Sequence, residues 1–221
     1  MSAPLAIDID GTMTRPDGGV DPRLFDPLRS WDGPVVVATG KSFPYPVALC
    51  AFIGIPERVI AENGGVLLLD DTVSVEGDAE AATAVATQLR ADGYPGGWPA
   101  PDMHNRWRET ELSVTREIPL DYLEEVATAH DQVVVDTGYA YHVKSPTVNK
   151  ATALERAAEL LDVPPGEFVA IGDSANDAEM FDLVERSYAM ANAADVAKAR
   201  ATTVTAGAYG DGVLEALEDL G

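Results

Sequence analysis

The sequence is poor in positively charged residues. Of its 221 residues, 37 are acidic and only 15 are basic, which gives a formal net charge of −22. Nucleic-acid backbones and anionic lipid surfaces attract Lys and Arg, so this charge argues against a partner of either kind. The hydrophobic fraction of 46% and the charged fraction of 24% are ordinary for globular proteins. These fractions favour a folded chain over a disordered one.

Among the charged residues Lys is the scarcest, with four copies against eleven of Arg. An acidic excess with little Lys and much Ala is typical of proteins from salt-rich cytoplasms. At molar salt the Debye length is only about 3 Å, so repulsion between surface carboxylates is screened. The composition therefore predicts a fold that needs salt.

Cysteine and long apolar runs are also lacking. Cys50 stands alone, which excludes an intrachain disulfide and a zinc site built from Cys, and its apolar neighbours at residues 47–52 predict a buried thiol. No segment approaches the roughly 20 apolar residues of a membrane helix, and the first residues lack the pattern of a signal peptide. We expect a cytoplasmic protein without a membrane partner, and either a monomer or a homodimer is compatible with the sequence. The three His residues show no metal-binding spacing and are expected to be packing or surface residues.

Short apolar segments alternate with helical patterns along the chain. The segments with the character of buried strands are residues 5–9, 35–38, 59–61 and 168–171, and residues 150–161 show the apolar stripe of a helix. This alternation predicts an α/β fold with a Rossmann-like parallel sheet, whose ligands bind beyond the carboxyl ends of the strands.

The middle of the chain has a different pattern. A hairpin is expected at residues 66–76, followed by helices at 79–91 and 120–129 and by strands at 112–115, 133–135 and 140–143. Hairpin connections indicate a small α+β unit inserted at residues 78–148. Residues 1–77 and 149–221 would then form one discontinuous core domain.

Carboxylates follow two of the predicted strands. Asp8 and Asp10 lie at the end of the first strand, and residues two apart on a strand share a side, so both should converge there. Asp173 and Asp177 follow the fourth. Asp-Gly turns and acidic first turns of helices are common, but neither accounts for two such groups at one sheet edge. Clustered carboxylates repel one another, and oxygen ligands of this kind suit Mg²⁺.

Two further segments suit a phosphate. Thr39 and Gly40 follow the second strand, and a hydroxyl with a neighbouring amide can hold phosphate oxygens. The Gly-Lys-Ser sequence here is no P-loop, because Val35 stands where that motif requires glycine. Lys150 begins a predicted helix, where cations are disfavoured, so it indicates an anionic partner.

Taken in order, these segments resemble the motifs of the haloacid dehalogenase-type phosphatase superfamily. The matching segments are DxDGT at residues 8–12, Thr39, Lys150 and GDxxND at residues 172–177. The inserted unit resembles the larger α+β cap of that superfamily, as does the segment at residues 62–65. Lys41 departs from the Arg that many capped members carry after the Thr-Gly pair.

The resemblance implies a phosphatase that acts on a small phosphomonoester. Asp8 would be the nucleophile that forms an aspartyl-phosphate, and Asp10 the general acid and base. The resemblance implies that Mg²⁺ is bound by Asp8, the backbone carbonyl of Asp10, Asp173 and Asp177. It also implies that phosphoryl oxygens are held by Thr39, Gly40 and Lys150.

Within that superfamily, residues 8–14, 145–150 and 172–177 are similar to the archaeal phosphoglycolate phosphatases, which implies 2-phosphoglycolate as substrate. Arg106 and Arg108 could bind its carboxylate, but surface pairing with Glu109 and Glu111 is the favoured interpretation. The alternatives are a phosphatase or phosphomutase for sugar phosphates, a receiver-type signalling domain, which would lack Asp10 and the insert, and a catalytically silent metal-binding protein.

The charge leads to a first prediction. Thermal unfolding should occur at a lower temperature in dilute buffer than in concentrated KCl, because dilute buffer restores the repulsion between surface carboxylates. Calorimetry in the two media measures this difference. Equal melting temperatures would contradict salt adaptation.

Overall fold

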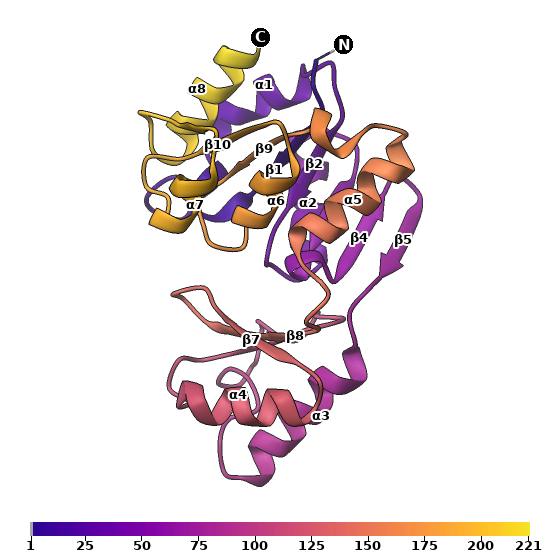
Figure 1. Cartoon of the computed structure of the whole chain (residues 1–221), viewed down its shortest axis with the longest axis vertical. Helices are drawn as coiled ribbons and strands as arrows, with labels where there is room; N and C mark the ends of the chain where they lie inside the picture. Colours follow the sequence, from indigo (N-terminus) through magenta and orange to yellow (C-terminus); the bar gives the residue numbers. More distant parts are fainter. Residues whose placement is uncertain (1) are drawn as a thin grey trace.

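The computed structural model describes residues 2–221 and arranges them around two sheets (Figure 1). The larger sheet has eight strands in the order β11-β10-β9-β1-β2-β3-β4-β5, parallel from β11 to β3 and antiparallel at β4 and β5. Its strands are β1 (Leu5–Ile7), β2 (Val35–Ala38), β3 (Arg58–Ala61), β4 (Val66–Leu69), β5 (Thr72–Val75), β9 (Val169–Gly172), β10 (Arg186–Ala189) and β11 (Thr203–Val204). The predicted parallel α/β sheet is confirmed, with the predicted hairpin added to its edge.

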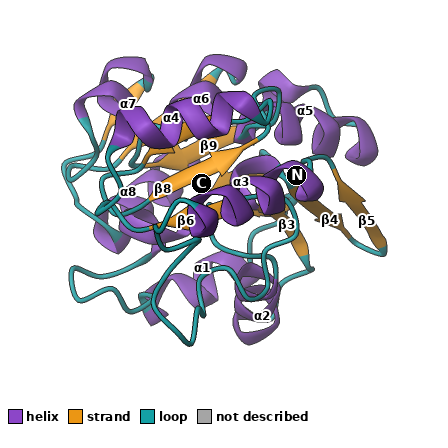
Figure 2. Ribbon diagram, turned by 90° about the horizontal axis from the view of Figure 1, so that it is seen from below, coloured by secondary structure: helices purple, strands orange, loops and turns teal. Residues whose placement is uncertain are grey.

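Helices cover both faces of this sheet, as Figure 2 shows. One face packs against α1 (Phe25–Arg29), α2 (Pro44–Ile53) and α8 (Gly210–Leu220), and the other against α5 (Lys150–Leu161), α6 (Ala178–Leu183) and α7 (Asp195–Arg200). The face with α1, α2 and α8 forms the first core, and the face with α5, α6 and α7 forms the second. In β1 the side chains of Leu5 and Ile7 enter the first core and that of Ala6 enters the second, which is why the strand is apolar throughout. Cys50 is buried in the first core, as predicted.

Helix α5 begins where the sequence predicted. The Asn149 side chain caps it by accepting a hydrogen bond from the Thr152 backbone amide, and the Thr152 hydroxyl oxygen accepts one from the Asn149 backbone amide. Leu154 is buried against the sheet as expected, but Leu160 is exposed and the smaller Ala158 is buried in the core. The cap fixes Lys150 as the first residue of the helix.

The second sheet lies in a segment inserted between β5 and α5, here called the insert. It comprises α3 (Ala79–Ala91), β6 (Leu112–Val114), α4 (Leu120–Ala129), β7 (Val133–Asp136) and β8 (Tyr141–Lys144). The strands pair antiparallel in the order β6-β8-β7. Both helices pack on the face that points away from the large sheet (Figure 1). Because side chains alternate along a strand, Tyr141 and Val143 pack under these helices, and His142 lies on the opposite face, toward the large sheet.

A tight turn between β3 and β4 contacts the insert and holds it against the large sheet. Glu62 and Asn63 both have left-handed backbone conformations, with φ of 52° and 53°. The buried Glu62 carboxylate accepts hydrogen bonds from the amides of Glu109 and Thr110 and from the Thr110 hydroxyl, at 2.8 to 3.0 Å. Burial raises the pKa of Glu62. The cost of the strained turn is offset by these contacts.

No helix among residues 2–221 is long and apolar enough to cross a lipid bilayer.

Removing the Glu62 carboxylate tests this contact. We expect Glu62→Ala to destabilise the protein by about 2–3 kcal/mol, because it leaves buried donors without an acceptor. Hydrogen exchange at the amides of Glu109 and Thr110 should accelerate, whereas amides of β2 should change little. The exposed Glu57→Ala is the matched control. Unchanged exchange at residues 109 and 110 would show that Glu62 does not hold the insert.

Candidate active site

The polar residues singled out in the sequence gather at one edge of the large sheet. Strands β1, β2 and β9 are neighbours and run parallel, so their carboxyl ends meet there. Asp8 follows β1, Thr39 and Gly40 follow β2, and Asp173 follows β9. The turn after β3 adds Asn63 to the same edge.

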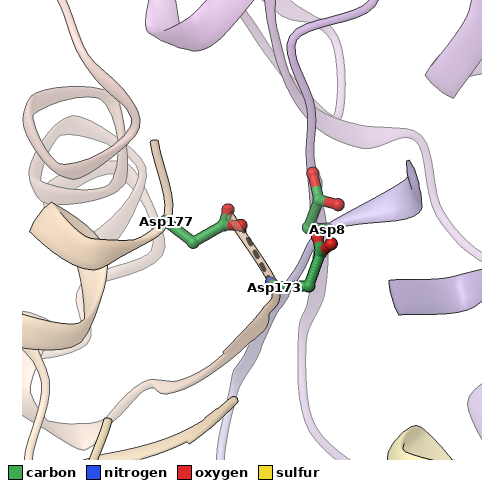
Figure 3. A group of neighbouring side chains, drawn as sticks. All are labelled: Asp8, Asp173 and Asp177. Carbon is green, nitrogen blue, oxygen red and sulfur yellow. Dashed lines mark hydrogen bonds between the residues drawn. The ribbon is translucent and has the colours of Figure 1, made fainter. Parts of the chain in front are cut away.

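Three carboxylates form the centre of the site (Figure 3). Asp8, Asp173 and Asp177 each offer an oxygen atom, and these atoms lie within 4.8 Å of one another. Two glycines permit this approach. A Cβ atom on Gly11 would lie 2.0 Å from Asp173 Oδ2, and one on Gly172 would lie 2.5 Å from Asp177 Cγ.

Lys150 connects two of these carboxylates. Its Nζ lies 2.7 Å from Asp8 Oδ1 and 2.7 Å from Asp177 Oδ1, and the side chain is fully buried. Burial by itself lowers the pKa of Lys150, but the charges of Asp177 and Asp8 outweigh burial and raise that pKa above its ordinary value. Lys150 is therefore charged, as the disfavoured position of a cation at a helix start had indicated.

The second oxygen of Asp177 is also fully engaged. Asp177 Oδ2 accepts hydrogen bonds from the amides of Asp173 and Ser174, at 3.1 and 2.9 Å. The dashed line in Figure 3 marks the first of these. Asp177 thereby orients both Lys150 and the loop that carries Asp173.

The cluster carries more negative charge than its own lysine can balance. Burial raises the pKa of Asp8 despite the opposing charge of Lys150, with further increases from Asp177 and Asp173. Burial, with the charge of Asp177, raises the pKa of Asp173 to about 7. Three carboxylates and one ammonium leave two negative charges in a buried site of oxygen ligands. These residues therefore fit a divalent metal ion.

Asp10 lies outside this cluster. Its side chain does not join the buried cluster, because β1 ends at Ile7 and the chain turns sharply through Gly11, but Asp8 and Asp10 line the same cavity. The Asp10 side chain is 57% exposed and its carboxylate lies 3.0 Å from Lys41 Nζ. Lys41, whose position departs from the family pattern, thus offsets the charge of Asp10.

A cavity of about 500 Å³ lies between this edge of the sheet and the insert. Asp8, Asp10 and Gly40 line it from the side of the sheet. Thr39 is fully buried, and its hydroxyl accepts a hydrogen bond from the Lys41 amide at 3.1 Å.

Residues of the insert line the other side of the cavity, and they include Arg108, His104 and His142. The sequence offered Arg108 as a candidate for binding a substrate carboxylate, whereas His104 and His142 were expected to be packing or surface residues. The expected pair of Arg108 and Glu111 does form, but it is buried and not at the surface. Strand alternation could have placed His142 opposite the buried Val143. No pattern in the irregular segment at residues 95–111 marks His104.

The acidic cluster predicts a pH-dependent response to metal. The pKa of Asp173 is raised to about 7 from an ordinary value of about 4, so its contribution to stability is full below pH 4 and is lost as the pH rises through 7. A bound divalent cation replaces the protons. A Mg²⁺ concentration of about 100 times the Kd at pH 8 should raise the melting temperature by about 5–10 °C at pH 8. The same concentration should raise it by much less at pH 5. Melting curves in concentrated KCl, with Mg²⁺ or with chelator, measure this, and Asp173→Asn is the control. An equal gain at both pH values would contradict the metal site.

Comparisons with known proteins identify relatives of this chain. A family model described as haloacid dehalogenase-like hydrolase matches residues 108–217. A phosphoglycolate phosphatase of Natronomonas pharaonis is 57% identical and covers 99% of this chain and 97% of its own. One from Halobacterium salinarum is 54% identical, covering 97% and 96%.

Solved structures show the same fold. Thermoplasma acidophilum 0175 has a TM-score of 0.86 at 28% identity, covering 100% of this chain and 98% of its own. A haloacid dehalogenase-like hydrolase from Bacteroides thetaiotaomicron has a TM-score of 0.80 at 19% identity and covers both chains completely. The motifs, the fold and the sequence relatives together show that the chain belongs to the haloacid dehalogenase-like hydrolases.

Proposed function

We propose that this hydrolase is an Mg²⁺-dependent phosphatase that converts 2-phosphoglycolate to glycolate and phosphate. The observation that carries the proposal is the Asp8 carboxylate, which lines the cavity, is bound by Lys150 and lies beside two further carboxylates. The curated names of the two sequence relatives from salt-loving archaea support this choice of substrate.

In the first step an oxygen of Asp8 attacks the phosphorus atom and the bond from phosphorus to the ester oxygen breaks. Asp10 donates its proton to the departing alkoxide, which leaves as glycolate. The position of Asp10 supports this role, because its exposed carboxylate lines the cavity and can exchange protons with water. Lys41 orients it.

In the second step Asp10 takes a proton from a water molecule, whose oxygen attacks the same phosphorus atom. The bond from Asp8 to phosphorus breaks, and phosphate and the Asp8 carboxylate are released. Lys150, the Thr39 hydroxyl and the Gly40 amide would hold the phosphoryl oxygens. The charge of Lys150 opposes the effect of burial on the pKa of Asp8 and so favours the ionised form, which a nucleophilic carboxylate requires.

Asp8, Asp173 and the backbone carbonyl of Asp10 would hold the Mg²⁺ ion. Both oxygens of Asp177 already have protein partners, so we place Asp177 behind the ion, in contact through water. The bound ion supplies positive charge that neutralises the cluster and the transferring phosphoryl group.

The insert would act as a cap over this chemistry. We assign the cap to residues 78–148 and the core domain to residues 1–77 and 149–221. The cavity between them supports this assignment, because a covered site excludes bulk water. The scarcity of Lys and the excess of acid support a salt-rich cytoplasm as the place of action.

A phosphate-release screen over small phosphomonoesters tests the proposal. The screen includes 2-phosphoglycolate and sugar phosphates, with and without Mg²⁺, at low and high KCl. We expect 2-phosphoglycolate to be hydrolysed with the highest kcat/KM, only with the metal. A sugar phosphate with a higher kcat/KM, or phosphate transfer without release, would contradict it.

Replacing the nucleophile gives a sharper test. Asp8→Asn should lower kcat by about 10⁴-fold or more, because the amide cannot form the covalent intermediate. The exposed Asp71→Asn, which makes the same chemical change in the hairpin between β4 and β5, should leave kcat unchanged. Retained turnover in Asp8→Asn would disprove the assignment.

A further inference from the structure

The cavity has two chemically different sides. The sheet side carries the acidic groups assigned above to the phosphoryl group and its metal. The insert side carries Arg108, His104 and His142. Donors on the insert side would meet the part of the substrate that is not phosphate.

The Arg108 guanidinium is buried with a donor to spare. Its side chain is 7% exposed. Nε donates to the carbonyl of His104 at 3.0 Å, and Nη1 donates to the carbonyl of Gly40 at 3.0 Å and to Glu111. Nη2 has no hydrogen-bond partner in the described part of the chain. Arg108 lines the cavity, so this remaining donor is available to an acceptor on a ligand.

The imidazole of His142 is arranged in the same way. Its Nδ1 lies 3.0 Å from Glu111 Oε1, and the ring lines the cavity. Burial raises the pKa of Glu111, but the charges of Arg108 and His142 outweigh burial and lower that pKa to about 2. Glu111 is therefore ionised, so Nδ1 carries the hydrogen of this bond. Nε2 has no protein partner among residues 2–221.

The Glu111 carboxylate holds both groups in place. Its Oε1 accepts from Arg108 and His142, and its Oε2 accepts from the Asn63 amide at 2.9 Å. The side chain is fully buried. Rigid support of this kind is typical of side chains whose remaining hydrogen-bonding atoms recognise a ligand.

We propose that Arg108 and His142 form a carboxylate-binding site, through Arg108 Nη2 and His142 Nε2, that selects esters with a carboxylate close to the phosphate. This inference rests on the proposed function, since it assigns the second end of the same substrate. A guanidinium is suited to a carboxylate. Because Nδ1 of His142 already carries a hydrogen, Nε2 donates to the carboxylate in the doubly protonated ring, whose charge the Glu111 carboxylate balances. The phosphoryl group must lie at Asp8, so the short molecule extends toward the insert.

Selectivity between two esters of similar size tests the assignment. The substrates are 2-phosphoglycolate and 2-hydroxyethyl phosphate, which replaces the carboxylate with a neutral hydroxymethyl group. The readout is the ratio of their kcat/KM values. Arg108→Gln and His142→Asn should each lower this ratio by about 10- to 100-fold. In His142→Asn the side-chain amide can still donate to Glu111, but asparagine has no atom at the position of Nε2.

Two further variants keep the experiment decisive. The double variant Arg108→Gln/Glu111→Gln does not leave the buried Glu111 carboxylate without its cation. It therefore reports on the ratio even if Arg108→Gln alone fails to fold. Arg108→Lys, which retains the charge, should restore part of the ratio. Arg106→Gln is the matched control, because Arg106 is exposed in the same segment and contacts Trp107, and it should leave the ratio unchanged.

The outcomes separate this inference from the proposed function. A wild-type protein that hydrolyses neither ester would disprove both. A wild type that prefers 2-phosphoglycolate, with the same ratio in every variant, would overturn the carboxylate site alone. Equal losses for both esters would also overturn it, because Arg108 would then serve the phosphoryl group. A selective fall in the ratio in both Arg108→Gln and His142→Asn would establish it.

Discussion

The buried ion pairs of Lys150 connect the parts of this fold that chemistry requires to be together. Lys150 begins α5, Asp8 follows β1 and Asp177 follows β9, so one ammonium group joins three segments that are distant in sequence. Removing one member would leave an uncompensated buried charge, which typically costs about 3–5 kcal/mol. The cation also lies at a helix start that disfavours it. The ion pairs with Asp8 and Asp177 therefore hold Lys150 at this position.

Much of the large sheet follows from local patterns. Apolar runs gave β1, β2, β3 and β9, and parallel strands share an edge, so the gathering of Asp8, Thr39 and Asp173 could be predicted. Strands β10 and β11 were missed because Arg186–Ala189 and Thr203–Val204 are short and partly polar, and lack an apolar run. The position of Asp10 outside the buried cluster was missed because strand periodicity ends with the strand, and the turn at Gly11 sets a new direction.

The insert side of the cavity could not be predicted from local patterns. Arg108 and Glu111 are three residues apart, which favours an exposed pair in an isolated segment. Tertiary contacts change this environment: the segment is held against the turn at Glu62 and Asn63, and water is excluded from the pair. A charge pair buried in this way depends on groups from β8 and from the large sheet, which no local window contains. The stability of the insert and the shape of the cavity thus share the same contacts.

One series of hydrogen bonds that runs from the sheet to the insert points in a single direction. Ser174 donates to Asn176, the Asn176 amide donates to Asn63 at 2.8 Å, and the Asn63 amide donates to Glu111 at 2.9 Å. Because an ionised carboxylate can only accept, Glu111, at the end of this series, sets the orientation of both asparagine side-chain amides. The direction of the hydrogen bonds is therefore decided in the insert, on the opposite side of the cavity from the phosphoryl chemistry.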